Sequence, residues 1–138
     1  MPAEDRRIDG TAVTEDLACP ADRTTARSRA CNRARARFFD NRGDQTTAPG
    51  GSYPSSASPF GVLDLAGNVW EWTNSLHWPY PYSADDGREW DHPEASGQRV
   101  IRGGSWNNGP SFLRTTARSG NYPGIGDDTV GFRCVRGR

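Results

Sequence analysis

The chain has 138 residues with 17 basic and 17 acidic side chains, so its formal net charge is zero. This balance gives no support for a polyanion such as nucleic acid as a partner. No apolar stretch approaches the roughly eighteen residues of a membrane span, and the start, MPAEDRRIDG, lacks the apolar segment of a signal peptide. Only 33% of the residues are hydrophobic, and 16 Gly and 10 Pro interrupt the chain, which predicts one loop-rich domain with a small core.

The first segment, residues 1–46, shows no pattern typical of a packed element. Its stretch TTARSRACNRARARFFDNR, residues 24–42, is rich in Arg and Ala and has no helical or strand-like apolar period. A basic strip for nucleic acid is disfavoured, because only Phe38 and Phe39 accompany the arginines and acidic residues flank them. A solvated segment or an ordered loop without its partner remains. We expect this segment to be poorly packed.

The stretch FGVLDLAGNVWEWTNS, residues 60–75, follows a turn-rich connector and concentrates oxygen donors and tryptophans. Asp64 and Glu71 are separated by Gly67, whose freedom at positive φ lets the backbone turn its carbonyls inward. Two carboxylates with backbone carbonyls are ligands typical of calcium. The alternative is that Asp64 and Glu71 cap turns or pair with arginines. Trp70 and Trp72 are expected in the core.

Two short strands are predicted in the second half of the chain. The stretch RVIRGGSW, residues 99–106, predicts a strand that breaks at Gly103 and Gly104. The stretch TVGFRCV, residues 129–135, alternates, and we expect it to pair antiparallel with the first strand. Residues 113–119, LRTTARS, predict a third strand, whereas residues 78–92 predict a long loop. The main cluster is expected to combine the aromatic residues Trp70, Trp72, Trp106 and Phe132.

The cysteines indicate neither a disulfide framework nor a zinc site. Cys19, Cys31 and Cys134 are odd in number and show no C-x-x-C spacing. Cys134 lies in the predicted final strand, and we expect it to be a small buried apolar residue. His77 and His92 are far apart in a loop and do not indicate metal ligands.

Four motifs in one order, GVLDLAGNVWEW, RVIRGGSW, TARSG and VGFRCVR, resemble the C-terminal part of the formylglycine-generating enzyme family, the sulfatase-modifying-factor domains. The resemblance covers residues 47–138. It implies an irregular, loop-rich α+β fold related to C-type lectins, with short antiparallel strands. Residues 1–46 then form a diverged segment, and we expect a fold truncated at its N-terminus, because the acidic helix of the family has no counterpart here.

The resemblance also implies a structural calcium ion. Its ligands are the side chains of Asp64 and Glu71 and the backbone carbonyls of Gly67 and Val69. A second family site corresponds less well in spacing to Asn32, the carbonyl of Arg33 and Asp44.

The family's copper site is not matched. Formylglycine-generating enzymes bind Cu(I) through two cysteines shortly after the Gly-Gly-Ser strand, and the matching positions here hold Asn108 and Leu113. We therefore expect no copper and no catalytic residue of that kind. The resemblance implies a calcium-stabilised binding module for a peptide or protein ligand. The alternative is an oxidoreductase of the family, either a formylglycine-generating oxidase or another non-heme metal-dependent enzyme.

Overall fold

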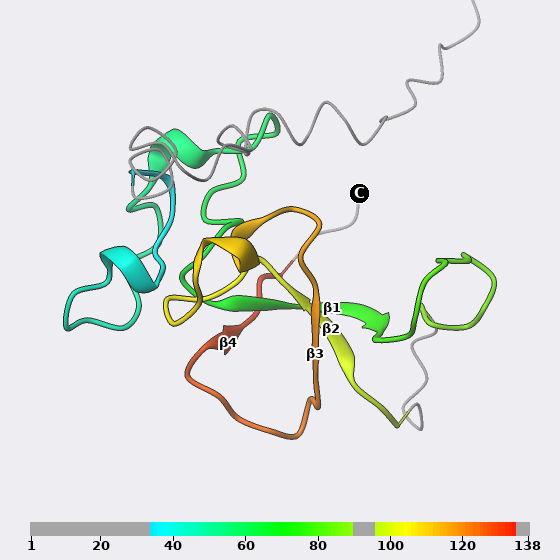
Figure 1. Ribbon diagram of the computed structural model, residues 1–138. Coiled ribbons are helices and arrows are strands. Elements are labelled where there is room, and N and C mark those ends of the chain that lie inside the picture. The colour runs from blue at the N-terminus through cyan, green and yellow to red at the C-terminus, as the bar shows by residue number, and fades with distance from the viewer. Residues whose placement is uncertain (1–33, 90–95, 135–138) are drawn as a thin grey trace, which may run out of the picture.

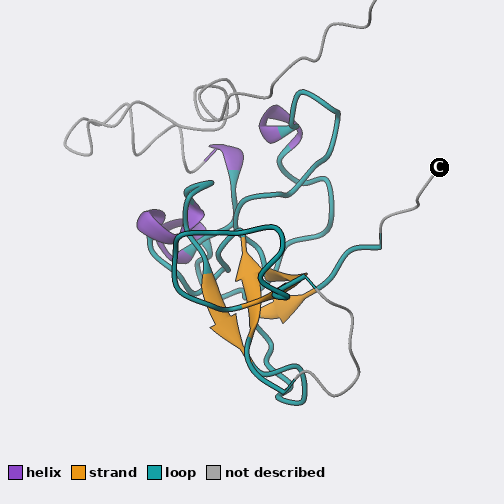
Figure 2. Cartoon of the chain, turned by 90° about the vertical axis from the view of Figure 1, so that its right-hand side faces the viewer, coloured by secondary structure: helices purple, strands orange, loops and turns teal. Residues whose placement is uncertain are grey.

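The computed structural model describes residues 34–89 and 96–134. Its centre is a four-stranded mixed sheet in the order β3-β2-β1-β4 (Figure 1). The strands are β1 (Trp70–Leu76), β2 (Arg99–Arg102), β3 (Ser119–Asn121) and β4 (Val130–Gly131), and the 3-10 helices are η1 (Phe39–Asn41), η2 (Pro54–Ser56) and η3 (Pro110–Leu113). Loops join these short elements, as Figure 2 shows, in agreement with the predicted loop-rich fold.

The pair β1 and β2 forms the middle of the sheet and is antiparallel. Trp72 lies opposite Ile101, and an irregularity in the register follows before Leu76 lies opposite Arg99. Val100 and Ile101 point to opposite faces, yet each is only 4% exposed, so both faces of the sheet are covered here. Consecutive β-branched residues suit such a doubly covered strand.

The predicted break after β2 is confirmed. Gly103 and Gly104 have φ angles of 95° and 75°, in the left-handed region that favours glycine. A Cβ atom at Gly104 would lie 2.9 Å from the carbonyl oxygen of Phe112. The chain therefore turns sharply and brings the 105–113 segment against the start of the sheet.

The core combines aromatic and aliphatic side chains from three parts of the chain. Trp70 and Trp106 are 6% and 8% exposed, as predicted, and the ring of Phe112 meets that of Trp70 edge to face at 6.0 Å. Trp72 is only partly buried, and Phe132 is 77% exposed. The prediction that Phe132 belongs to the aromatic cluster is therefore wrong, because β4 ends at Gly131 and no strand pairing continues there.

Residues 36–38 pack into this core, although poor packing was expected before residue 47. Ala36 and Phe38 are 3% and 1% exposed. The guanidinium of Arg37 donates to the carbonyl oxygens of four residues that follow it, Asn41, Arg42, Gln45 and Thr46, at 2.8 to 3.3 Å. This side chain thus holds the 37–46 loop together by charge-assisted hydrogen bonds. The pattern of apolar and polar residues in the sequence does not reveal them. Residues 1–33 of the predicted segment lie outside the described residues.

The predicted pairing of the final strand is wrong in partner and direction. β4 runs parallel to β1, with Trp70 opposite Val130 and Glu71 opposite Gly131. The Trp70 N–H donates to the carbonyl of Thr129 at 2.7 Å, which places β4 on the edge away from β2. A two-residue strand carries too little pattern to determine its neighbour.

The strand predicted at residues 113–119 is also wrong. Pro110 begins η3 at a position where its missing N–H is harmless, and the segment then turns through a hydrogen bond from the Ala117 N–H to the Arg114 carbonyl at 2.9 Å. Only Ser119 joins a strand, β3, which pairs antiparallel with β2. In the part of the chain that the structure describes, no helix has the length and apolar character needed to cross a membrane.

Candidate functional site

The candidate cation site lies where the 63–69 loop enters β1. Asp64, Gly67 and Asn68 have φ angles of 57°, 76° and 68°, so the loop reverses direction within a few residues. A Cβ atom at Gly67 would lie 2.2 Å from the carbonyl oxygen of Arg37. Glycine is therefore required at this position for a close approach of two backbones, which form a parallel bridge between Arg37 and Gly67.

Asn68 fixes this loop to three other segments. Its side chain accepts from the Ala48 N–H at 2.8 Å and donates to the Ala48 carbonyl at 3.2 Å. Its backbone N–H donates to the Arg37 carbonyl and its carbonyl accepts from the Trp106 N–H, each at 2.8 Å. An asparagine tolerates positive φ better than most residues, and its amide satisfies both groups of Ala48. These contacts connect the turn at Asn68 to residues 37, 48 and 106.

Glu71 pairs with Arg133 from the far end of the chain. The Arg133 Nε donates to Glu71 Oε2 at 2.7 Å, and its Nη2 pairs with Oε1. The same guanidinium donates to the carbonyls of Leu63 and Asp64 at 3.1 and 3.2 Å. One planar cation thus gathers a carboxylate and two carbonyl oxygens, in a fork geometry typical of Arg.

Asp64 contributes a second negative charge to the same place. Its Oδ2 accepts from the Gly51 N–H at 2.6 Å. Hydrogen bonding to Glu71 raises the pKa of Arg133, and the charges of Glu71 and Asp64 add to this shift. Both predicted carboxylates therefore act on one cationic position. The observed contacts agree with the alternative expectation, because Asp64 accepts from a backbone N–H and Glu71 pairs with an arginine.

The donor set fits calcium in kind. It offers two carboxylates and the carbonyls of Gly67 and Val69, and calcium accepts irregular arrangements of oxygen ligands. Among the described residues no group of three or more His, Cys, Asp or Glu side chains gathers, so the two carboxylates do not belong to a larger cluster of ligand side chains. Arg133 bonds to both carboxylate oxygens of Glu71.

Asn108 lies at the first position where the resemblance places a copper cysteine. Its Oδ1 accepts from the N–H and the hydroxyl of Ser105 at 2.9 and 2.8 Å, and Ser105 is 1% exposed. Its carbonyl accepts from the Phe39 N–H at 3.1 Å. The amide oxygen therefore closes a turn. Leu113 ends η3 and offers no ligand atom.

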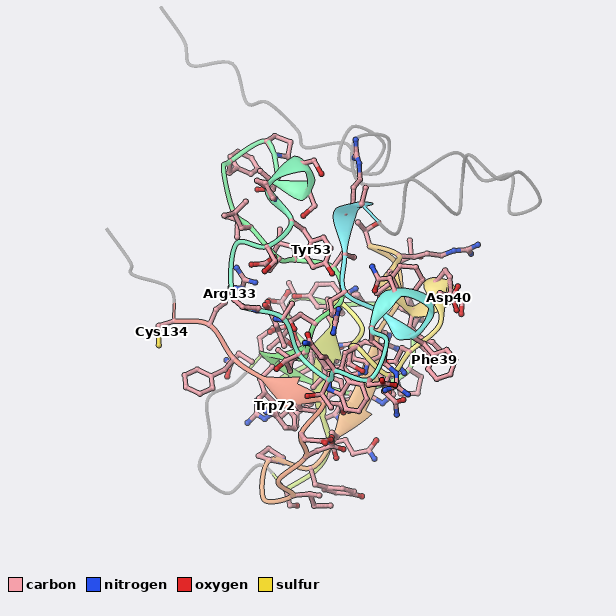
Figure 3. The ribbon with its side chains drawn as sticks, turned by 90° about the vertical axis from the view of Figure 1, so that its left-hand side faces the viewer. Phe39, Asp40, Tyr53, Trp72, Arg133 and Cys134 are labelled. Atoms are coloured by element: carbon pink, nitrogen blue, oxygen red, sulfur yellow. The ribbon has the colours of Figure 1, made fainter. Side chains whose placement is uncertain are left out.

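The other predicted residues lie apart from this site. Cys134 is exposed, and Figure 3 shows it at the edge of the molecule, so the expected burial of this thiol is wrong. It lies three residues beyond the end of β4 at Gly131. His77 packs against Gly120, where a Cβ atom would lie 2.7 Å from its ring. Four further residues, Cys19, Cys31, Asn32 and His92, and the carbonyl of Arg33 lie outside the described residues, whereas Asp44 is exposed.

The sequence pattern of the sulfatase-modifying factor enzyme 1-like domain matches residues 14–138. The chain belongs to this family. The match starts well before residue 47, where the resemblance was expected to begin. Among its relatives, "Serine/threonine-protein kinase pkn1" of Chlamydia caviae is 37% identical over 108 residues, which cover 77% of this chain and 16% of the relative. "Inactive C-alpha-formylglycine-generating enzyme 2" of Bos taurus is 38% identical over 96 residues, or 63% of this chain and 27% of that protein.

A solved structure supports the same family at the level of the fold. PvdO from Pseudomonas aeruginosa superimposes with a TM-score of 0.61 and 29% identity, over 83% of this chain and 42% of PvdO. This sulfatase-modifying-factor domain spans about a sixth of the chlamydial kinase and about a quarter of the bovine protein. The family is thus shared by proteins that differ in name and length.

Proposed function

We propose that this domain is a calcium-stabilised binding module on a C-type-lectin-like scaffold, without the copper-dependent oxidase activity of formylglycine-generating enzymes. The observation that carries the proposal is the structural role of the Asn108 side chain. At a position where that activity needs a thiolate, the amide oxygen closes the turn at Ser105. The family includes a relative that its name describes as inactive, so loss of this activity is compatible with family membership.

The scaffold suits binding because loops carry much of the surface around a small sheet. Large exposed side chains occur on several of these loops, among them Phe60, Tyr80, Tyr82 and Tyr122 at 51% to 80% exposure. Exposed aromatic residues are enriched where proteins bind ligands. A peptide or protein ligand is therefore the class that this surface favours.

Calcium is proposed at Asp64 and Glu71 with the carbonyls of Gly67 and Val69. The experiment compares thermal unfolding of the purified chain with calcium, with magnesium and with EDTA. Calcium at a hundredfold excess over its Kd should stabilise the fold by about 2.7 kcal/mol, because it binds the folded state. Asp64→Asn and Glu71→Gln should abolish the effect. Asp85→Asn removes an equal charge from an exposed loop position and should leave it unchanged.

Arg133→Gln distinguishes calcium binding from replacement of calcium by the guanidinium. If both cations use Glu71, calcium should stabilise the Arg133→Gln protein more than the parent. No calcium effect on either folded protein would overturn the calcium assignment and leave Arg133 as the cation of the site.

The lack of oxidase activity is tested separately. The protein is incubated with Cu(I), O₂ and a Cys-x-Pro-x-Arg peptide, and mass spectrometry follows conversion of cysteine to the aldehyde. We expect no conversion, since an amide and a leucine cannot replace soft thiolates. Turnover that survives replacement of Cys19, Cys31 and Cys134 by alanine would refute the non-oxidase proposal and favour another oxidoreductase chemistry.

A further inference from the structure

A cavity of about 130 Å³ lies against β1 and β2, beneath the loop that follows β1. Thr73 and Val100 belong to its sheet side, and Tyr80 and Tyr82 come from the loop. An apolar cavity of about 150 Å³ holds benzene, so this space takes a group of about one ring. The residues of the candidate cation site do not line it.

The charged side chains that line the cavity are arginines, and the carboxylates of Asp86 and Glu89 bond to the lining residues Arg88 and Ser75. Arg88, Arg102 and Arg118 line the cavity, and no Asp or Glu does so among the described residues. Arg88 is 4% exposed and pairs with Asp86 at 2.5 Å, which compensates its charge. Within the described part of the chain, neither Arg102 nor Arg118 has a carboxylate at ion-pair distance.

Within the described residues, Arg102 and Arg118 donate to neutral partners. Arg102 Nη1 donates to the carbonyls of Thr115 and Ala117 at 3.1 and 3.3 Å. Arg118 Nη2 donates to the Trp78 carbonyl at 2.7 Å. Each guanidinium has five N–H donors, and the described partners accept from only one nitrogen of each group, Nη1 of Arg102 and Nη2 of Arg118. Carbonyl oxygens orient the two groups without neutralising them.

Aromatic rings give the cavity flat walls. The Arg118 guanidinium lies 4.2 Å from the centroid of Tyr80, and that of Arg88 lies 5.0 Å from the centroid of Tyr82. Stacking on a ring fixes the plane of a guanidinium. The hydroxyls on the sheet side are already engaged, since Thr73 donates to the Val100 carbonyl at 3.0 Å and Ser75 to Glu89. Recognition of a ligand must therefore come from the arginines and the rings.

We propose that this cavity binds the carboxylate of a small planar or aromatic ligand, held by Arg102 and Arg118 beside the tyrosine rings that line it. A carboxylate matches the guanidinium fork with two parallel hydrogen bonds, and an attached ring fits the volume and the flat walls. The inference adds a small-ligand site to the peptide- or protein-binding function proposed above.

The test is titration of the full chain with benzoate, followed by calorimetry and by the Arg Nε–H signals in NMR spectra. Benzamide serves as the neutral probe of the same shape. Benzoate should bind, with benzamide at least about tenfold weaker, and the Nε–H signals of Arg102 and Arg118 should shift in the unmodified protein. Added salt should weaken benzoate binding, because the attraction is between charges.

Variants then locate the site. Arg102→Gln and Arg118→Gln should each weaken benzoate binding about tenfold. Arg99→Gln removes the same charge from the same strand, but Arg99 does not line the cavity and bonds to the Asn74 carbonyl, so binding should be unchanged.

Equal affinity for benzamide, no binding by the folded parent, or shifts confined to other arginines would overturn the proposal. Calcium-dependent melting is a separate measurement, so failure of either assay leaves the other result intact. The NMR signals of the parent decide the question even if a variant does not fold.

Discussion

The close approach at Gly67 can be tested by adding one methyl group. In Gly67→Ala the new Cβ atom would lie 2.2 Å from the Arg37 carbonyl oxygen and 3.1 Å from the Arg37 nitrogen. The neighbour is backbone, so the strain cannot be relieved by a side-chain rotation. The 37–38 segment and the 67–68 turn must move apart.

The magnitude follows from the conformation and from the contacts that separate. The φ angle of 76° in Gly67 costs alanine about 1 kcal/mol. Two hydrogen bonds depend on the approach, from the Gly67 N–H to the Gly103 carbonyl at 2.7 Å and from the Asn68 N–H to the Arg37 carbonyl at 2.8 Å. At about 1 kcal/mol each, the expected loss in the free energy of unfolding is about 3 kcal/mol.

Gly61→Ala is the matched control. Gly61 has a φ angle of 77°, and no heavy atom outside its chain neighbours lies within 4 Å of a Cβ placed there. It should lose only the conformational part, about 1 kcal/mol. The assay is urea unfolding of the three proteins followed by tryptophan fluorescence. Equal losses in the two variants would refute the argument that the Arg37 backbone lies against Gly67.

Two further predictions concern the core and the acid response. Trp106→Ala should lower the free energy of unfolding by about 3 to 5 kcal/mol, whereas Phe132→Ala, at a site 77% exposed, should change it by no more than about 0.5 kcal/mol, both measured in urea. The Asp127 carboxylate accepts from the hydroxyl and the N–H of Thr129, which lower its pKa. Its stabilisation should therefore be complete above the unfolded pKa of about 3.9 and be lost as the pH falls through the lower folded value. Asp127→Asn should weaken this pH dependence in unfolding curves, and an unchanged curve would contradict the assignment.

The sequence predicts β2 and its end well because both signals are local. Val100 and Ile101 are β-branched, and Gly103 and Gly104 permit positive φ without strain. The aromatic core around Trp70 and Trp106 is predicted for a similar reason, since large apolar side chains are few in this polar chain.

The strand β1 and the partner of β4 could not be predicted from the same local signals. WEWTNSL contains the alternation of a strand, but the nearby acids and glycine favoured a metal loop. Strand order depends on contacts such as that between Trp70 and Thr129, which lie 59 residues apart by their numbers. The prediction of poor packing before residue 47 is wrong at Arg37, whose buried side chain bonds to backbone carbonyls. A sequence does not distinguish such an arginine from a solvent-exposed one.

In the candidate cation site at residues 64–71, one set of contacts holds the backbone and another compensates the charge of the carboxylates. Gly67 and Asn68 are held by Arg37, Ala48, Gly103 and Trp106, and none of these bonds involves a carboxylate. These contacts fix the turn through uncharged groups, while the charges of Asp64 and Glu71 still require compensation. Arg133 supplies it by bridging Glu71 to the carbonyls of Leu63 and Asp64. A calcium ion at this position would act on the same charges, so its contribution to stability should be largest when the guanidinium is removed.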